Sequence, residues 1–262
     1  MGVGSPATDH HPGLERDRIL REECLTGPEV SFFALCDGQR AVPILSAQDH
    51  KRIFDDDGGP NTGGMGAFAP SPLMTAPLAD RVMRDIVRPV IDGMHAEGHP
   101  YRGFLYVGLM LTCDGPRVIE FNVRFGDPEA QVVVPMIAAD LAPRLAAAAA
   151  GALDDSPVTV TSEPHVGVVL ASAGYPGAVQ SGAVIHGLDE AAAVGGVLVF
   201  HAGTRRSEAG VVTAGGRVLT VVGRGATYDD AIARAYEGAS RVSFDGMQYR
   251  RDIGRKALSP GA

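Results

Sequence analysis

A carboxylate, an amide and a guanidinium stand at every second position of the apolar stretch 117–124 (RVIEFNVR). Successive side chains of a β-strand point to opposite faces. One face would carry the polar residues Glu120, Asn122 and Arg124, and the core-facing side would carry the apolar residues Ile119, Phe121 and Val123. Mg²⁺ takes such oxygen ligands and shares them with substrate phosphates, and an arginine can stabilise a phosphoryl group in transfer. A half-buried strand with a polar outer face gives the same alternation, so both interpretations stay open.

A second stretch that could bind a substrate is residues 46–72, whose turn-forming residues predict a long loop. In its run GPNTGGMGA (59–67), Gly63, Gly64 and Gly66 leave backbone N–H groups approachable and permit positive φ. The run QDHKR (48–52) adds two cations suited to phosphate or carboxylate. Long loops inside compact domains are usually functional, but a plain Gly-rich connector is an equally open interpretation.

The remaining elements must hold these two stretches in place. Asp37-Gly38 and Asp114-Gly115, each between apolar runs, predict hairpins over 29–45 and 103–123. Apolar residues every fourth position predict a helix over 76–97, capped by Thr75 and ended by Gly98. Asp140 caps a second predicted helix over 140–153.

The C-terminal third alternates apolar runs with Gly-rich turns. The clearest strands are predicted at 166–173, 197–202 and 217–222, followed by a helix over 228–242 whose Thr227 and Asp230 have capping-box spacing. Residues 1–18 read as a flexible lead-in. The polar, Pro-containing stretch 154–165 marks a domain boundary, which predicts one domain over 19–155 and another over 166–258.

Bulk composition excludes several classes of protein. The net charge is -8 and no basic block occurs, which argues against nucleic-acid and anionic-membrane partners. No apolar run approaches the roughly 20 residues of a membrane helix. Three cysteines without a CxxC pair predict a reduced, cytoplasmic protein. The adjacent His10 and His11 are weak evidence for a metal site.

The run RFGDPEAQ (124–131) follows the Glu-Phe-Asn strand directly, and together with QDHKR and GPNTGGMGA it resembles the signature of phosphoribosylamine–glycine ligases in the ATP-grasp superfamily. Residues 22–31 (EECLTGPEVS) resemble the family's hinge. The runs GYPG (174–177), IHGL (185–188), HAGT (201–204), TAGGRVL (213–219) and RDIG (251–254) resemble its C-terminal domain. The resemblance covers about residues 20–258. It implies an α+β fold, in which the large half of an ATP-grasp domain, an antiparallel sheet with packed helices, precedes a smaller α+β domain.

The resemblance also implies a reaction and a set of site residues. ATP would phosphorylate glycine, and 5-phosphoribosylamine would attack the glycyl phosphate to give glycinamide ribonucleotide, with Mg²⁺ or Mn²⁺ as the metal. The metal ligands would be Glu120 and Asn122, and the catalytic residues Arg124 and Asp127. The nucleotide would be bound by Glu22, Glu23, Cys24, Leu25 and, at the ribose, Glu29. The other substrates would be bound by Lys51, Asn61, Thr62, Gly63, Gly64, Gly66 and Arg217.

The family's N-terminal GGREH-like turn and its two ATP-contacting lysines have no counterpart in this sequence. We therefore expect an N-terminally truncated chain with little activity alone, exposed apolar surface and a tendency to associate. Two alternatives are one half of a split enzyme, completed by a separate chain, and a non-catalytic remnant that acts as a binding protein. A different ATP-grasp carboxylate–amine ligase is a further alternative, disfavoured by the long RFGDPE and GPNTGGMGA matches.

Overall fold

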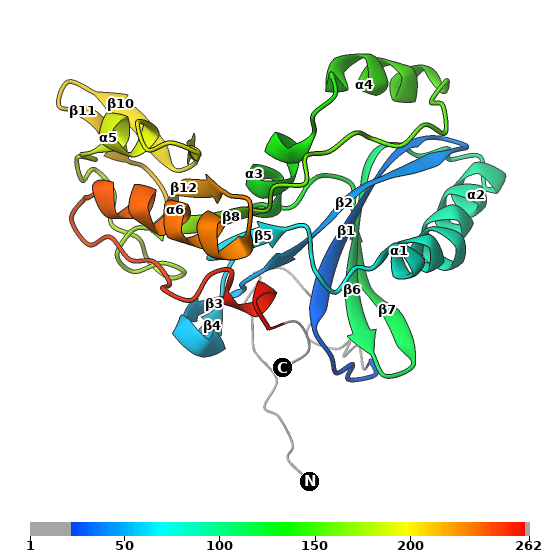
Figure 1. The fold of residues 1–262 in the computed structure, drawn as a ribbon, viewed down its shortest axis with the longest axis horizontal. Helices are drawn as coiled ribbons and strands as arrows, with labels where there is room; N and C mark the ends of the chain where they lie inside the picture. The colour runs from blue at the N-terminus through cyan, green and yellow to red at the C-terminus, as the bar shows by residue number, and fades with distance from the viewer. Residues whose placement is uncertain (1–21, 260–262) are drawn as a thin grey trace, which may run out of the picture.

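An eight-stranded antiparallel sheet runs through the whole computed structural model, which describes residues 22–259 (Figure 1). The predicted lead-in 1–18 and the His10–His11 pair lie outside the described residues. In spatial order the strands are β7 (Gly115–Asn122), β6 (Arg102–Thr112), β1 (Glu29–Asp37), β2 (Ala41–Asp49), β5 (Gly66–Ala69), β8 (His165–Ala171), β12 (Arg217–Arg224) and β9 (Val197–His201).

Both predicted hairpins are confirmed. In the β1–β2 turn, the Asp37 carboxylate accepts hydrogen bonds from the backbone N–H groups of Gln39 and Arg40 at 2.9 and 2.6 Å, and Gly38 takes a φ of +100° that favours glycine. The β6–β7 turn likewise closes with Thr112 opposite Gly115. These local turn signals fix the register of the four strands that carry most of the site.

The predicted helix over 76–97 forms as one helical segment on one face of the sheet: α1 (Ala76–Val82), a π-helical turn η2 (Met83–Val87) and α2 (Arg88–Ala96). Thr75 caps it by accepting from the Leu78 N–H at 3.4 Å, and Gly98 follows its end with φ +80°. The wide turn precedes Pro89, which has no N–H to continue the regular ladder. Val82 and Ile91 are buried against Phe32 of β1.

The opposite face is covered by α3 (Glu129–Val133), the 3₁₀ turn η3 (Val134–Met136) and α4 (Leu141–Ala150). The predicted cap is confirmed, since the Asp140 side chain accepts from the Ala142 N–H at 3.0 Å. A core of Phe33, Leu35, Val132 and Met136 forms here. This face also receives Val222 from β12, so side chains from distant parts of the chain share one core.

The C-terminal third forms the strands and helix predicted for it. Helix α6 (Tyr228–Arg241) lies on β8 and β12, with Thr227 accepting from the Asp230 N–H at 3.2 Å. A short helix α5 (Leu188–Ala192) and a separate hairpin of β10 (Thr204–Ser207) and β11 (Gly210–Thr213) lie at the far edge (Figure 1). The division between 155 and 166 remains a prediction, and the sheet itself continues from β5 to β8 by four antiparallel residue pairs.

The prediction of an unstructured loop over 46–72 was wrong in part. Strand β2 continues to Asp49, and a hairpin follows: β3 (Arg52–Phe54), the turn η1 (Asp55–Asp57) and β4 (Gly58–Asn61). Strand β5 then enters the centre of the sheet between β2 and β8. The sequence could not indicate this, because β5 has only four residues and its partner β8 lies about a hundred residues further on.

The orientation predicted for the Glu-Phe-Asn strand was right for its polar face and wrong for its apolar face. Glu120 and Asn122 pair with Gly108 and Tyr106 and share one face. Ile119, Phe121 and Val123, however, are 44%, 42% and 73% exposed. The reason is that β7 is an edge strand with a bulge at Ile119. Val118, not these residues, packs toward the helical layer.

Candidate active site

The polar residues at one end of the sheet come from four neighbouring strands and share one face. Ser31 of β1 is opposite Gly108 of β6, which in turn is opposite Glu120 of β7. Glu29 lies two residues before Ser31, and Asp49 lies two residues after Ala47, the partner of Ser31 in β2. Because side chains alternate along each strand, all of them project to the face opposite the α1–α2 layer.

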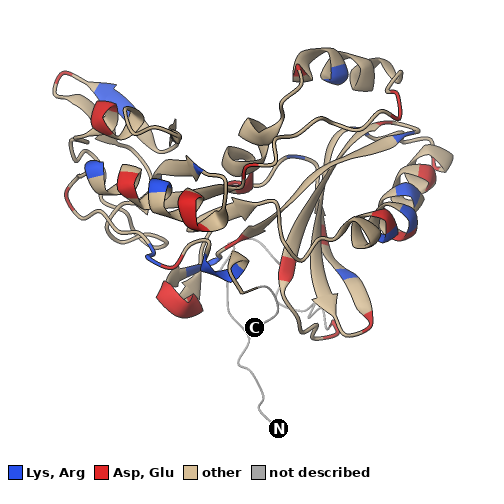
Figure 2. Ribbon diagram, in the orientation of Figure 1, with Lys and Arg blue, Asp and Glu red and all other residues tan. Residues whose placement is uncertain are grey.

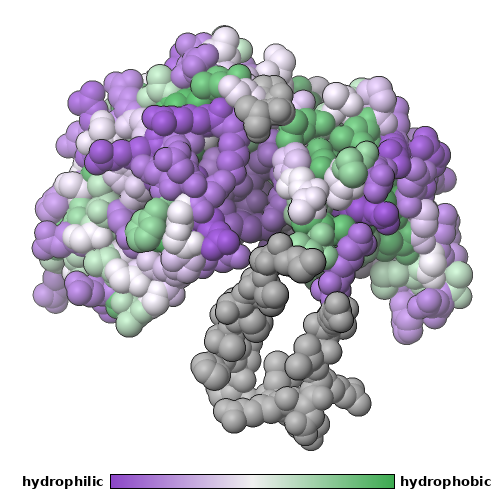
Figure 3. Space-filling view, turned by 90° about the horizontal axis from the view of Figure 1, so that it is seen from below, coloured by the Kyte–Doolittle hydropathy of each residue, from purple (hydrophilic) through white to green (hydrophobic). Residues whose placement is uncertain are grey.

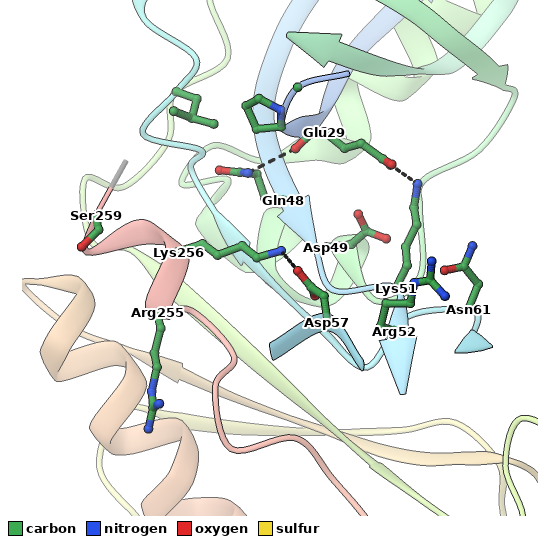
Figure 4. Close-up of a pocket in the computed structure, with 13 residues that line it drawn as sticks. Glu29, Gln48, Asp49, Lys51, Arg52, Asp57, Asn61, Arg255, Lys256 and Ser259 are labelled. Carbon is green, nitrogen blue, oxygen red and sulfur yellow. Dashed lines mark hydrogen bonds and ion pairs between the residues drawn. The ribbon is translucent and has the colours of Figure 1, made fainter. Parts of the chain in front are cut away.

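A cavity of about 900 Å³ opens beside this face. Figure 4 shows, around it, Glu29 and Asp49 from the sheet, Lys51 just before β3, Asn61 at the end of β4, and Lys256 from the C-terminal 3₁₀ turn η4 (Arg255–Ala257). Figure 3, seen from below, shows a hollow between the two sides of the molecule where these elements meet. In Figure 2 acidic and basic segments lie together at the β3–β4 hairpin and η4.

Lys51 is the cation at the centre of these carboxylates. Its ammonium group pairs with the Glu29 carboxylate. Although partial burial acts to lower it, the carboxylates of Asp49 and Glu29 raise the pKa of Lys51 above its ordinary value. Lys51 therefore stays charged at neutral pH and can meet an anionic ligand.

Two further carboxyl groups lie near Lys51: Asp49, which is half-buried, and Glu129, which is buried. Burial raises the pKa of Asp49. Burial, followed by the nearby Asp49 charge, raises the pKa of Glu129 to about 7. The Ser31 hydroxyl lies 3.2 Å from Glu129 Oε1 and 3.0 Å from the Tyr106 hydroxyl. This network places part of the RFGDPE run under the sheet face that carries Glu120.

Glu120 and Asn122 have oxygen atoms that suit a divalent cation, and they share one face of β7, although Asn122 lines neither cavity. A second, narrow cavity is lined by Glu120 together with Glu29, Asp49 and Lys51. Among residues 22–259 no cluster of three or more His, Cys, Asp or Glu residues has the geometry of a metal site. A two-oxygen site completed by the phosphates of a bound nucleotide fits that finding, because Mg²⁺ commonly takes few protein ligands.

Arg217 joins the two Gly- and Pro-containing runs. Its guanidinium donates to the carbonyl of Gly63 at 2.6 Å and to that of Asp127, and it lies 3.1 Å from Asp127 Oδ2. The Tyr175 hydroxyl accepts from the Gly63 N–H at 2.9 Å. At Gly64, with φ +114°, a Cβ would lie 2.4 Å from Pro128. Residues 63–64 and 127–128 are therefore held in contact by side chains from the C-terminal third.

The predicted site residues are not all brought together. Glu29, Lys51 and Asn61 line the larger cavity. Thr62 follows Asn61, and its hydroxyl donates to the Lys51 carbonyl at 2.8 Å. The other predicted residues lie elsewhere. Arg124 is exposed beyond β7 and donates to the Phe125 carbonyl, Gly66 is buried within β5, and Glu22, Glu23, Cys24 and Leu25 precede β1 and line neither cavity.

Two family models match the chain: the ATP-grasp (A) domain of phosphoribosylglycinamide synthetase over residues 7–130 and the C domain of the same enzyme over 165–256. The first match begins inside the predicted lead-in. Phosphoribosylamine–glycine ligases from Brucella melitensis and Chlorobaculum tepidum are 46% and 48% identical over 246 residues, 94% of this chain. The chain belongs to the phosphoribosylamine–glycine ligase family. It spans 58% of the length of these two relatives.

Solved structures agree with this family and its fold. The phosphoribosylamine–glycine ligase of Thermotoga maritima superposes with a TM-score of 0.80 at 38% identity, over 88% of this chain and 56% of that one. N5-carboxyaminoimidazole ribonucleotide synthetase of the same organism, 14% identical, has a TM-score of 0.58 over 85% of this chain and 54% of that one. This second likeness concerns the fold alone. The ATP-grasp family model and the Thermotoga maritima ligase confirm the predicted architecture of antiparallel sheet and packed helices.

The sequence motifs did not identify several residues around the cavity. Asp49 belongs to the QDHKR run, but the sequence does not show that its carboxylate acts on Glu129. The folded chain brings the two groups together, and the Asp49 charge acts to raise the pKa of Glu129. Asp57, Arg255 and Lys256 line the cavity as well. Asp57 and Lys256 are 199 residues apart and form an ion pair at 2.6 Å. The RDIG run adjoining η4 was the one available signal.

Proposed function

We propose that this chain provides the sheet face and loops on which an ATP-dependent ligase joins glycine to 5-phosphoribosylamine. One observation carries the proposal: residues of the hinge, QDHKR, GPNTGGMGA and Glu-Phe-Asn runs converge on two adjoining cavities that share Glu29, Asp49 and Lys51. A chance assembly of motifs would not bring four separate stretches of the chain to one face of one sheet.

The reaction would proceed in two steps. A glycine carboxylate oxygen attacks the γ-phosphorus of ATP, the bond from phosphorus to the bridging oxygen breaks, and ADP leaves. The amine nitrogen of 5-phosphoribosylamine then attacks the carbonyl carbon of glycyl phosphate, phosphate leaves, and the amine proton passes to solvent. Both steps need orientation and stabilisation of negative charge, which the Lys51 ammonium group can supply.

Glu120 and Asn122 would hold Mg²⁺ or Mn²⁺. When bound, the cation would neutralise phosphate charge. Glu29 would accept hydrogen bonds from the ribose hydroxyls. For this, the Lys51–Glu29 ion pair must open, or Glu29 must bind both groups at once.

The exposed Ile119 and Phe121 offer an apolar surface beside Glu120. Arg217 and Tyr175 would keep loop 61–64 in shape, so Arg217 acts on substrate through Gly63 and Asp127.

The remainder of the site would come from a polypeptide equivalent to the rest of the relatives' length, either joined to this chain or separate. A binding protein without turnover is the competing function, and the intact Glu120, Asn122 and Asp127 set favours the ligase.

Three free cysteines fit a reduced compartment, and we propose the cytoplasm. In the described part of the chain no helix has the length and apolarity to cross a membrane.

Metal–nucleotide binding tests the proposal on the chain as it stands. Titration of Mn²⁺–ATP, followed by electron paramagnetic resonance of free Mn²⁺, should give saturable binding. Glu120→Gln should weaken it by tenfold or more, which corresponds to about 1.4 kcal/mol. Asp114→Asn, at the tip of the same hairpin, is the control and should bind like the parent chain.

Turnover separates the ligase from a binding protein. With a partner polypeptide equivalent to the relatives' remaining length, ADP release should require both glycine and 5-phosphoribosylamine. Saturable Mn²⁺–ATP binding without such turnover would favour the binding protein. Absence of Mn²⁺–ATP binding, or binding indifferent to Glu120→Gln, would contradict the proposed site.

A further inference from the structure

The turn of the β3–β4 hairpin is made of three consecutive aspartates, Asp55–Asp57, which we call the acidic turn. Each of its residues is bound by the C-terminal segment 250–256, which we call the latch. The bonds run from Arg251 N–H to Asp55 Oδ1 at 2.7 Å, from Asp56 N–H to Asp252 Oδ2 at 3.0 Å, from Arg250 Nη1 to Asp57 Oδ1 at 2.9 Å, and from Lys256 Nζ to Asp57 Oδ2 at 2.6 Å.

Arg250 is the centre of the latch and its side chain is fully buried. It forms a two-pronged pair with Asp252, at 2.8 and 2.5 Å, and also donates to the backbone carbonyl of Arg52 at 3.1 Å. Although burial acts to raise it, the Arg250 guanidinium and the Asp56 N–H lower the pKa of Asp252 to about 2. A buried arginine with four acceptor contacts cannot be replaced by a single-point cation such as lysine.

The latch is itself fixed to the core. The Tyr236 hydroxyl of α6 donates to the Arg250 carbonyl at 2.9 Å and accepts from the Ile253 N–H at 2.9 Å. Ile253 is completely buried in the cluster that also holds β8 and α6 side chains. The acidic turn is therefore tied, through the latch, to the buried core of the C-terminal third.

The acidic turn has a conformation that it would not adopt readily alone. Asp56 and Asp57 have φ values of +54° and +52°, the two positive values among the described non-glycine residues. Such left-handed residues cost free energy unless their surroundings over-determine them. The four bonds between the acidic turn and the latch hold Asp56 and Asp57 in this conformation.

The two legs of the hairpin lead directly into the candidate site. Lys51 precedes β3 and Asn61 ends β4, and the Thr62 N–H donates to the Lys51 carbonyl at 2.7 Å. We infer that the latch sets the conformation of the β3–β4 hairpin, and that Arg250 is a positioning residue for Lys51 and Asn61. The inference rests on the proposed function only for what those two residues bind.

Arg250→Lys tests the latch in the whole chain. Amide hydrogen exchange of 54–62, measured by mass spectrometry, should accelerate on the order of 100-fold, because removing the bidentate donor leaves buried acceptors unpaired. Exchange in β8 and β12 should be unchanged. Arg144→Lys is the matched control: Arg144 donates to Ser156 and Pro157 of another loop, so exchange should rise around 154–157 only.

Asp56→Gly supplies a rescue. Glycine takes positive φ without strain and keeps the backbone N–H that binds Asp252. In the Arg250→Lys background it should slow exchange at 54–62 by roughly two- to fivefold and recover part of the lost Mn²⁺–ATP affinity. A substitution that merely loosened the fold would not be rescued at this one residue.

The outcomes are distinct. Local exchange that rises, Mn²⁺–ATP affinity that falls and rescue by Asp56→Gly together support the inference. A folded Arg250→Lys chain with parental exchange at 54–62 overturns it, as does faster exchange with undiminished Mn²⁺–ATP affinity. A parent chain that binds no Mn²⁺–ATP overturns the proposed function instead. In that case the hydrogen-exchange rates of Arg250→Lys, with and without Asp56→Gly, still test whether the latch sets the hairpin conformation.

Discussion

Glu129 is a carboxyl group that the fold has removed from water, at the end of the run that follows β7. It is 5% exposed, its carboxylate lies close to Gly126, where a Cβ would be 2.4 Å away, and the charge of the half-buried Asp49 carboxylate acts on it. Such a group favours its neutral form.

This burial predicts a pH dependence of stability. The pKa of Glu129 is raised from 4.5 to about 7 in the folded chain, so its stabilising contribution is complete below pH 4.5 and is lost as pH rises through 7. Glu129→Gln, which cannot ionise, should lack that loss. Its free energy of unfolding should exceed the parent's by about 3 kcal/mol at pH 8 and match it near pH 4.5.

Urea unfolding at pH 4.5, 6 and 8 measures this difference. Glu208→Gln, exposed in the β10–β11 turn, is the control and should follow the parent profile. A Glu129→Gln curve parallel to the parent at all three values would show that Glu129 is ionised without cost in the folded chain.

At the scale of elements, close contact between α6 and β12 depends on a missing side chain. A Cβ on Gly223 would lie 2.3 Å from the Ala231 carbonyl oxygen and 2.3 Å from the Ala235 nitrogen. Gly223→Ala should therefore push α6 from the sheet and lower the free energy of unfolding by about 1–3 kcal/mol.

Gly93, exposed in α2 with open space around it, is the counterpart. Gly93→Ala should raise the free energy of unfolding by about 0.5–1 kcal/mol. Thermal unfolding of both variants checks the opposite signs, and equal effects would refute this packing.

Elements with local signals could be predicted from the sequence, and elements that depend on distant partners could not. The Asp-Gly turns and the Thr75, Asp140 and Thr227 caps all formed as expected, because each involves residues a few positions apart. Strand β5 was missed because its edge is defined by β8. The exposure of Phe121 was missed because alternation indicates which residues share a face and not whether anything covers that face.

The candidate site divides in the same way. Glu120 and Asn122 could be placed on one face by alternation, and Lys51 beside the hairpin by its motif. Arg250 gave no such signal, because its partner Asp57 is 193 residues away and a buried arginine is rare enough that composition argues against it. The role of Arg217 changed for the same reason, since its acceptors belong to two distant loops.

At the scale of the whole molecule, the sheet and the cores are shared between the two predicted domains. Phe200 and Val222 belong to the cluster around Phe33 and Val132, and β5 hydrogen-bonds to β8. We therefore expect a single unfolding transition. Hydrogen exchange of β1–β6 peptides and of β8–β12 peptides at increasing urea should lose protection at one midpoint. Two separated midpoints would contradict it and favour independent domains at the 155–166 division.

The pairing of β5 with β8 also sets a waiting time during synthesis. Strand β5 leaves the ribosome with β2 as its neighbour, and its other edge has no partner until β8 emerges about a hundred residues later. At roughly 5–20 residues per second this interval is on the order of 5–20 s. For that time a fully apolar, four-residue edge, Gly66–Ala69, is open to pairing with other nascent chains. Yield should therefore depend on translation speed between residues 70 and 171, and slow codons there should increase aggregation of the newly made chain.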